Sequence, residues 1–307
     1  MTPCGRFAPS PTGDLHLGSL LAAAGSYLDA RQAGGRWLLR IEDLDTPRIV
    51  AGAEARILRT LEACGFEWDG AILHQADRRD AYRAALDTLA RKGASFECSC
   101  SRKDLLDAGG ARVTGGGAYP GTCRQRPTRP GPTSTRLRVP DGSLSFDDRI
   151  QGPQHFAWSA LGDVLIRRRD DIPAYQLAVV VDDAEQGVTD VVRGADLLDS
   201  TPWQIAIAQA LGLAPPRYAH LPVLVEPDGA KLSKSRRAVP VDPGRARRFL
   251  HTALSLLGLE PPADLDGAPV GDLWAWALPR WAPERLRGVR TLPASEILGG
   301  CSPVGLS

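Results

Sequence analysis

The sequence predicts an α/β fold built on a parallel sheet. Strand-like and helix-like segments alternate from the N-terminus, with strands expected over residues 5–10 and 36–43 and a helix over 17–33 between them. Such alternation is typical of a parallel sheet with helices packed on its faces. The chain has 307 residues, of which 43% are apolar and 24% charged, which is ordinary globular composition with room for two domains.

The first strand and helix are joined by an unusual turn, PSPTGDLHLGS. Pro9 and Pro11 fix the backbone angle φ, and Gly13 permits a positive φ, so the turn should be tight and stiff. It brings His16 to the start of the helix, where unpaired N–H groups and the helix dipole attract anions. From this stretch alone, an anion site and a plain capped loop are both open interpretations.

The remaining elements are expected in a fixed order along the chain. They are helices over 50–64 and 77–92, a strand over 94–100, irregular chain over 101–134, hairpins over 135–152 and 163–183, a core strand over 190–198, a helix over 200–212, and helical segments over 243–259 and 270–290. The hairpins would form a small inserted subdomain.

Composition excludes several classes of protein. No apolar run is long enough to cross a bilayer and no apolar signal segment opens the chain, so we expect a cytoplasmic protein without membrane contact. The net charge is only +1, so any nucleic acid must bind to a local patch. Six scattered cysteines do not make a disulfide framework.

The lysines are unevenly placed. Only four of the 37 basic residues are lysines, and two of these, Lys231 and Lys234, lie in the segment KLSKS at 231–235. Lysine is a compact, mobile point charge, unlike the planar fork of arginine. The segment is therefore a candidate phosphate-binding loop, and the alternative is a solvated surface loop.

These motifs carry a resemblance to a known family. RFAPSPTGDLHLGS and KLSKS resemble the two ATP-binding signatures of the class I aminoacyl-tRNA synthetases, and RIEDLD and VVRGADLL are similar to their glutamyl and glutaminyl branch. The likeness covers roughly residues 5–240. It implies a Rossmann-like (HUP-type) parallel sheet, an inserted small α+β subdomain with zinc, and a short helical C-terminal region.

The resemblance also predicts domain boundaries and a subfamily. We expect the first half of the core over 1–97, the inserted subdomain over 98–182, the second half over 183–235 and the C-terminal region over 236–307. The 72 residues after Ser235 are too few for the usual anticodon-binding domains. The chain thus resembles the glutamyl-queuosine tRNA(Asp) synthetases, which activate glutamate with ATP without tRNA and attach it to queuosine in the anticodon.

The resemblance implies a role for each motif residue. The residues implied for L-glutamate are Arg6, Ala8, Ser10, Glu42, Tyr175 and Arg193, and those for ATP, with magnesium, are His16, Gly18, Lys231 and Lys234. Two arginines and one glutamate complement two carboxylates and one ammonium. Taken singly, Glu42 could instead cap a helix, Tyr175 could be core and Arg193 could form a surface ion pair. Ser19 stands where many class I enzymes have a second histidine.

Three cysteines indicate a zinc site. Cys98, Cys100 and Cys123 supply three thiolates, and the resemblance implies Tyr119 as the fourth ligand. Ligand chemistry alone would favour His74 or His155. The alternative is three unrelated buried cysteines.

Two other functions stay open. The chain could be a truncated glutamyl-tRNA synthetase that charges a 3′ end, or a catalytically silent paralogue that binds glutamate or nucleotide. Candidate contacts to the tRNA(Asp) anticodon loop are the arginines of 236–248 and Trp274, Trp276 and Trp281, although the tryptophans also suit a helix core.

Overall fold

Two sheets built mainly of parallel strands lie side by side at the centre of the protein. A computed structural model describes residues 2–107, 119–126, 129–226 and 240–294. In the first sheet, β1 (Cys4–Phe7), β2 (Arg36–Ile41) and β3 (Leu73–His74) are parallel and adjacent in that order. The second has the order β7–β6–β10–β9, in which β6 (Ser143–Asp148), β10 (Arg217–Leu221) and β9 (Asp190–Gly194) are parallel and β7 (Gly152–Ala157) is antiparallel to β6. The Thr189 N–H donates to the Cys4 carbonyl oxygen at 2.9 Å, so β9 begins beside β1.

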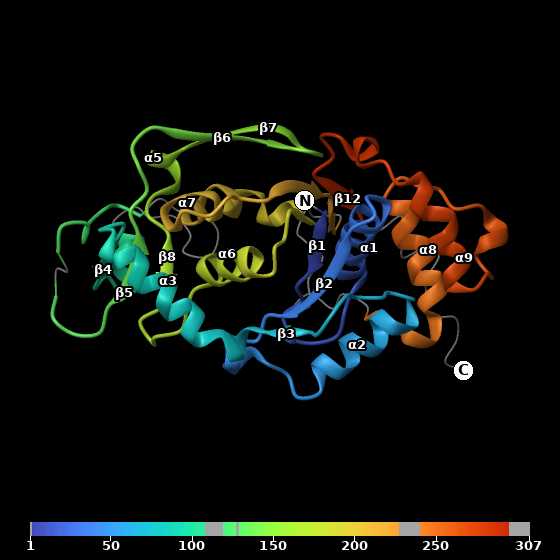
Figure 1. Cartoon of the computed structure of the whole chain (residues 1–307), viewed down its shortest axis with the longest axis horizontal. Coiled ribbons are helices and arrows are strands. Elements are labelled where there is room, and N and C mark those ends of the chain that lie inside the picture. The colour runs from blue at the N-terminus through green and yellow to red at the C-terminus, as the bar shows by residue number, and fades with distance from the viewer. Residues whose placement is uncertain (1, 108–118, 127–128, 227–239, 295–307) are drawn as a thin grey trace.

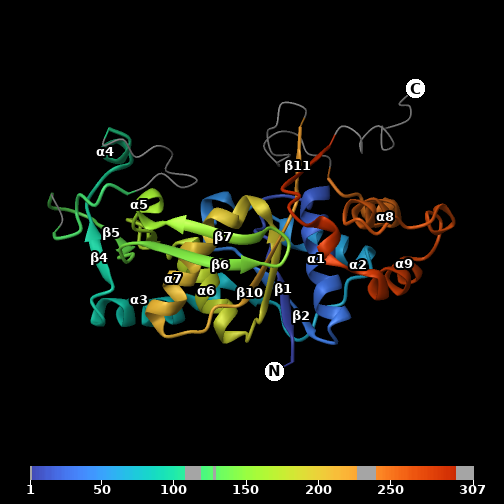
Figure 2. The ribbon, with the colours of Figure 1, turned by 90° about the horizontal axis from the view of Figure 1, so that it is seen from above.

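The other elements surround these sheets. The helices are α1 (Leu17–Gln32), α2 (Ala53–Ala63), α3 (Arg79–Arg91), α4 (Arg102–Asp107), α5 (Trp158–Leu161), α6 (Tyr175–Glu185), α7 (Thr201–Leu211), α8 (Ala246–Leu256) and α9 (Val270–Ala277). The remaining strands are β4 (Ser95–Cys98), β5 (Ser134–Leu137) and β8 (Leu165–Arg167) in one antiparallel sheet, and β11 (Val223–Val225) with β12 (Thr291–Pro293). The molecule is elongated, with β4 and β5 at one end and α8 and α9 at the other (Figures 1 and 2).

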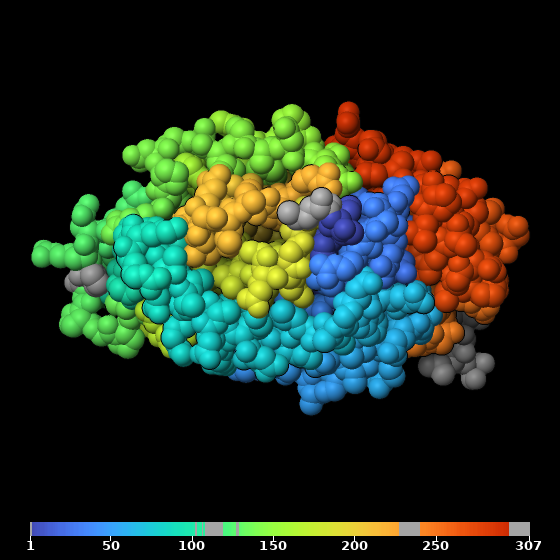
Figure 3. All heavy atoms as spheres, viewed as in Figure 1, coloured from blue at the N-terminus to red at the C-terminus, as the bar shows by residue number. Residues whose placement is uncertain are grey.

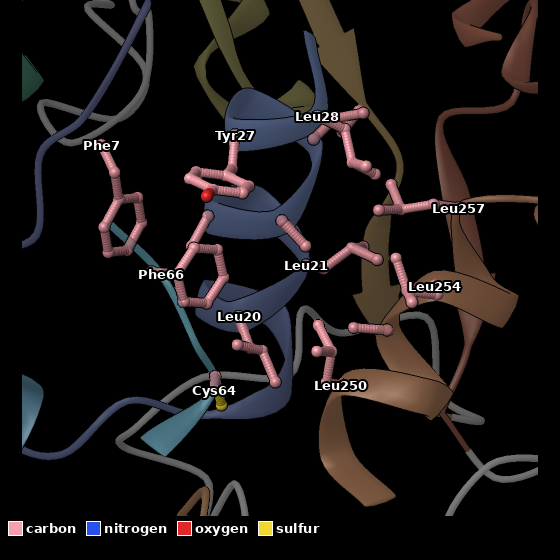
Figure 4. Close-up of a cluster of buried hydrophobic side chains, with 14 of the residues drawn as sticks. Phe7, Leu20, Leu21, Tyr27, Leu28, Cys64, Phe66, Leu250, Leu254 and Leu257 are labelled. Atoms are coloured by element: carbon pink, nitrogen blue, oxygen red, sulfur yellow. The ribbon is translucent and has the colours of Figure 1, made fainter. Parts of the chain in front are cut away.

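Helix α1 is the centre of the main core. Its Tyr27 ring packs edge-on against Phe66 with 5.3 Å between the ring centres, and its leucines meet Leu250, Leu254 and Leu257 from the region of α8 (Figure 4). Burial on all sides requires close approach of the backbone: a Cβ atom at Gly25 would lie 2.5 Å from Cδ1 of Leu221 on β10. The packing therefore fixes α1, and with it the turn that precedes it, against both sheets.

The predicted helices 17–33, 50–64, 77–92 and 200–212 and the strands that open the chain are confirmed within a few residues. Two predictions are wrong. Residues 175–185 form helix α6 and not the second strand of a hairpin. The segment 135–152 is not one hairpin either, because β5 pairs with β4 and β8 whereas β6 pairs with β7 and β10. A short helix, α4, also occurs within the stretch predicted to be irregular.

The C-terminal helices pack on α1 through their tryptophans. Trp274 donates to the Cys64 carbonyl oxygen at 2.9 Å, and Trp281 donates to Asp29 at 3.2 Å; both rings are buried. Figure 3 shows this region lying against the N-terminal half of the chain. Trp274 and Trp281 are therefore core residues, as the alternative interpretation had it. No helix in the described part of the chain is long and apolar enough to cross a membrane.

Candidate functional site

One large pocket gathers most of the predicted site residues. Its volume is about 940 Å³, at the upper end of the roughly 300–1,000 Å³ of small-molecule sites. It lies where β1, β2 and β9 end and α1 begins, as expected for a parallel sheet. The predicted residues that line it are Arg6, Ala8, Ser10, His16, Gly18, Glu42, Tyr175 and Arg193. Lys231 and Lys234 lie outside the described residues.

His16 caps the helix that opens onto the pocket. Its Nδ1 accepts the Ser19 N–H at 3.2 Å, and the Ser19 hydroxyl lies 3.2 Å from Nε2. A Cβ atom at Gly18 would lie 3.1 Å from the ring, so this position has little room for a side chain. The turn is built as the sequence predicts, with Gly13 at a φ of 139°. His16, Gly18 and Ser19 thus place the N-terminus of α1 at the pocket.

The chain after the KLSKS segment returns to this helix end. Pro240 forms a β-bridge with His16, and the Val241 N–H donates to the Leu15 carbonyl oxygen at 2.8 Å. These contacts tie the described chain at 240–241 to the start of α1. Residues 240–241, which begin five positions after Ser235, therefore contact the first of the two segments that resemble ATP-binding signatures.

A buried ionic network supports Arg6 at the floor of the pocket. Arg6 Nε donates to Asp183 at 3.2 Å, and Arg40 Nη2 donates to the same carboxylate at 2.7 Å. Burial would raise the pKa of Asp183, but Arg6 and Arg40 outweigh it and hold that pKa below its usual range. The described residues give the terminal nitrogens of Arg6 no hydrogen-bond acceptor. Arg6 is therefore held by Nε while its terminal nitrogens are available to an anion in the pocket.

Glu42 follows β2 and faces the same pocket. Its backbone N–H donates to the Pro9 carbonyl oxygen at 3.0 Å, which joins the loops that follow β1 and β2. Burial raises the pKa of Glu42 to about 7, although Arg40, 3.8 Å away, and Arg6 act in the opposite direction. No helix begins at Glu42, so the alternative prediction that it caps a helix is wrong. A largely buried carboxyl group whose pKa lies near 7 is well suited to pair with a substrate ammonium.

Tyr175 and Arg193 form the opposite wall. Tyr175 is the first residue of α6, and its hydroxyl lies 3.5 Å from Arg193 Nη1. Arg193 is buried, and its described partners, His220, Tyr175, Leu197 and Thr201, carry no carboxylate. The alternative prediction, that Arg193 forms a surface ion pair, is therefore wrong. A buried cation without a counter-ion favours a carboxylate ligand over a neutral amide.

The three predicted cysteines come together beside Tyr119, which lines the pocket. The sulfur atoms of Cys98, Cys100 and Cys123 all lie within 4.8 Å of one another. Cys98 Sγ donates to the Tyr119 hydroxyl oxygen at 3.4 Å. Burial is the main cause that raises the pKa of the Cys100 thiol to about 12. Three sulfurs and a phenol oxygen at this spacing fit a structural zinc ion.

Neither predicted histidine alternative joins this cluster. His74 Nε2 lies 2.8 Å from Glu54, and His155 Nδ1 lies 2.9 Å from Ser145 on the β6–β7 hairpin. The cluster also borders the pocket, since Tyr119 lines it together with Arg136, whose guanidinium lies 4.1 Å from the Tyr119 ring centre. A metal there would stiffen one wall of the pocket.

Sequence reasoning missed the residues that hold the pocket residues in place. Asp183 and His220 lie outside the family motifs, and Arg40, the first residue of RIEDLD, has no predicted role. Each of the three nevertheless contacts an arginine or a carboxylate of the pocket. One signal was present: two adjacent aspartates end the apolar run AVVV, where charges are costly unless paired.

Comparisons with known proteins agree with this geometry. The family model described as "tRNA synthetases class I (E and Q), catalytic domain" matches residues 4–265. A protein from Pseudomonas fluorescens named Glutamyl-Q tRNA(Asp) synthetase is 50% identical over 95% of this chain and 96% of its own length. One of the same name from Dechloromonas aromatica is 54% identical over 90% of this chain and 93% of its own.

Solved structures of glutamyl enzymes share the fold. The crystal structure of a glutamate-tRNA synthetase from Elizabethkingia anophelis matches with a TM-score of 0.78 at 27% identity, covering 96% of this chain and 69% of its own. A glutamate tRNA ligase from Elizabethkingia meningosepticum, solved with its amino acid, also matches with a TM-score of 0.78, at 26% identity over 96% of this chain and 68% of its own. The chain therefore belongs to the class I tRNA synthetases of the glutamyl and glutaminyl type, which are ligases, and within them to the glutamyl-Q tRNA(Asp) synthetase family.

Proposed function

We propose that the protein activates L-glutamate with ATP and then attaches the glutamyl group to the queuosine base in the anticodon of tRNA(Asp). In the first step a glutamate carboxylate attacks the α-phosphorus of ATP, and glutamyl-adenylate forms as pyrophosphate leaves. In the second step the acceptor group of the base displaces AMP. The names of relatives about 50% identical support the acceptor.

One observation carries the proposal: the charges in the pocket complement glutamate. Arg6 and Arg193 are two buried cations that face the pocket, and Glu42 is a largely buried carboxylate between the loops, with its side chain 11% exposed. Glutamate offers two carboxylates and one ammonium, so each charge finds an opposite partner. Ala8, Ser10 and Tyr175 line the remaining contact surface.

The start of α1 supports the ATP site. His16 and Gly18 border the pocket at the N-terminus of α1, and this end of a helix suits phosphate. Lys231 and Lys234 would bind the ATP phosphates from the neighbouring segment, and magnesium would accompany the nucleotide. Zinc would be held by Cys98, Cys100 and Cys123 with Tyr119 as fourth ligand, and would supply only a structural cross-link. A reaction on tRNA with ATP suits the cytoplasm.

Glutamate-dependent exchange of pyrophosphate into ATP, measured without tRNA, tests the first step. We expect exchange, because the glutamate-binding side chains all come from this chain. Glutamine should be rejected, because its amide leaves an arginine buried and unpaired, at a cost of about 1–3 kcal/mol. No exchange at saturating glutamate, or equal exchange with glutamine, would refute the proposal.

A further inference from the structure

Three adjacent strands place a carboxylate, an imidazole and a guanidinium in one line beneath the pocket. Arg193 on β9 and His220 on β10 are direct neighbours in the parallel pairing. Asp148 ends β6, the next strand, and lies opposite Tyr218 of β10. All three residues are buried, with His220 at 0% exposure. The register of the sheet, and not a loop, therefore sets their contacts.

The contacts define where the imidazole proton lies. His220 Nδ1 lies 2.6 Å from Asp148 Oδ2, and His220 Nε2 lies 3.1 Å from Arg193 Nε. A carboxylate can only accept a hydrogen bond and a guanidinium can only donate one. The Thr201 hydroxyl also lies 3.2 Å from Nε2, and a hydroxyl can donate to it. These partners assign a neutral His220 with its proton on Nδ1 and its lone pair on Nε2 facing Arg193 and Thr201.

The same contacts determine which part of Arg193 reaches the pocket. Its Nε–H is held by His220, and Nη2 donates to Thr201 Oγ1 at 2.9 Å and to the Leu197 carbonyl oxygen at 3.3 Å. Nη1 has only the Tyr175 hydroxyl, at 3.5 Å, among the described residues. Nη1 is thus the nitrogen that Arg193 presents to a ligand.

We propose that Asp148 and His220 are positioning residues for Arg193. Asp148 holds the His220 proton on Nδ1, so Nε2 retains the Arg193 Nε–H and Nη1 is aimed at a carboxylate of glutamate. This inference rests on the proposed glutamate site. Neither residue touches the substrate; both act by fixing the direction of a cation that has no carboxylate partner among the described residues.

Asp148→Asn tests the inference most sharply. The amide would donate to Nδ1 and move the imidazole proton to Nε2, where it would confront the Arg193 N–H. We expect the glutamate KM in pyrophosphate exchange to rise about tenfold or more, with the ATP KM within about twofold. His220→Gln, whose carbonyl oxygen can accept from Arg193, should retain more activity than His220→Phe. In the His220→Phe background, Asp148→Asn should add no further rise in KM, because no imidazole remains whose tautomer could change.

Nitrogen NMR of protein labelled with ¹⁵N-histidine gives a readout that does not depend on activity. The chain has five histidines, and His220→Gln assigns the signal. We expect a proton on Nδ1 only, and we expect this state to persist down to about pH 5. Burial lowers the pKa of His220 to about 4; Arg193 acts in the same direction, whereas Asp148 and Asp196 oppose it. The Asp148→Asn protein should carry the proton on Nε2.

The outcomes separate the two proposals. Absence of exchange in the unaltered protein refutes the proposed function, while the NMR tautomer still tests the Asp148–His220 arrangement. A proton on Nε2, or a doubly protonated ring at pH 7, overturns the inference. So does an Asp148→Asn protein that exchanges normally, or one that loses glutamate and ATP affinity equally. If Asp148→Asn does not fold, the His220 variants and the NMR of the unaltered protein decide.

Discussion

Glu42 titrates close to neutral pH because its carboxyl is buried at the floor of the pocket. Burial raises the pKa to about 7, so below that pH the group is increasingly neutral and cannot pair with an ammonium. We therefore expect kcat/KM for glutamate, measured by pyrophosphate exchange, to fall about tenfold per pH unit below pH 7.

Glu42→Gln should abolish this pH dependence and raise the glutamate KM by about 10- to 100-fold. This factor corresponds to the free energy of one charge-assisted hydrogen bond. Glu62→Gln is the matched control, because Glu62 is exposed on α2. An unchanged pH profile in Glu42→Gln would show that another group titrates.

Lys234 is the better candidate of the two signature lysines for a phosphate that moves during the reaction. Lys234→Arg keeps the charge but replaces a compact ammonium by a planar fork. We expect the activation rate to fall by about 100-fold or more, with glutamate binding nearly unchanged, because the contact is made mainly in the transition state. Pre-steady-state adenylate formation and equilibrium glutamate binding measure the two quantities. Equal losses in both would indicate a structural loop.

At the residue scale, the sequence predicts the side chains that face the ligand. It predicts less well the side chains that hold these in place. Arg6, Glu42 and Arg193 lie in short motifs whose charges match the substrate, and the structure places all three in one pocket. Asp183 and His220 are 177 and 27 positions from the arginines they hold, so only the folded register brings them together. Their roles could not be read from local spacing.

At the scale of elements, helix α6 shows where pattern reasoning fails. Its run of valines favours a strand, but the helix is buried on nearly all sides, and periodicity cannot then separate the two conformations. The helical conformation matters for the site. It places Tyr175 and Asp182 about two turns apart on one face, with Asp183 beside Asp182 to hold Arg6.

The proposed zinc site would join the end of β4 to the chain around Cys123. We expect one zinc ion per chain, measured by metal analysis of protein purified without chelator. Serine at Cys98, Cys100 or Cys123 should release it and increase proteolysis within residues 98–134. Cys64→Ser is the control, because Cys64 is a buried cysteine outside the cluster.

Absence of zinc in the unaltered protein would contradict the metal proposal. Tyr119→Phe tests the fourth ligand separately. Full zinc affinity in that variant would leave the three-cysteine site intact and reject the phenolate.

At the scale of the whole molecule, the described arginines at the start of α8 and just before it are better candidates for tRNA contact than the tryptophans. Arg245, Arg247 and Arg248 belong to exposed positions, whereas Trp274 and Trp281 are buried against α1 and α2. The predicted division at residues 97, 182 and 235 stays a prediction. The parallel pairing of β6 with β10 nevertheless links the middle segment closely to the second half of the core.

The acceptor position is the central claim, and the location of the glutamyl label tests it most directly. Labelled glutamate, ATP and tRNA(Asp) carrying queuosine are incubated with the protein, and the tRNA is digested to nucleosides. We expect the label on the anticodon nucleoside, also in tRNA that lacks its 3′-terminal adenosine, and no label in tRNA with guanine in place of queuosine. Label on the 3′-terminal adenosine would contradict the account and identify a glutamyl-tRNA synthetase that charges the 3′ end.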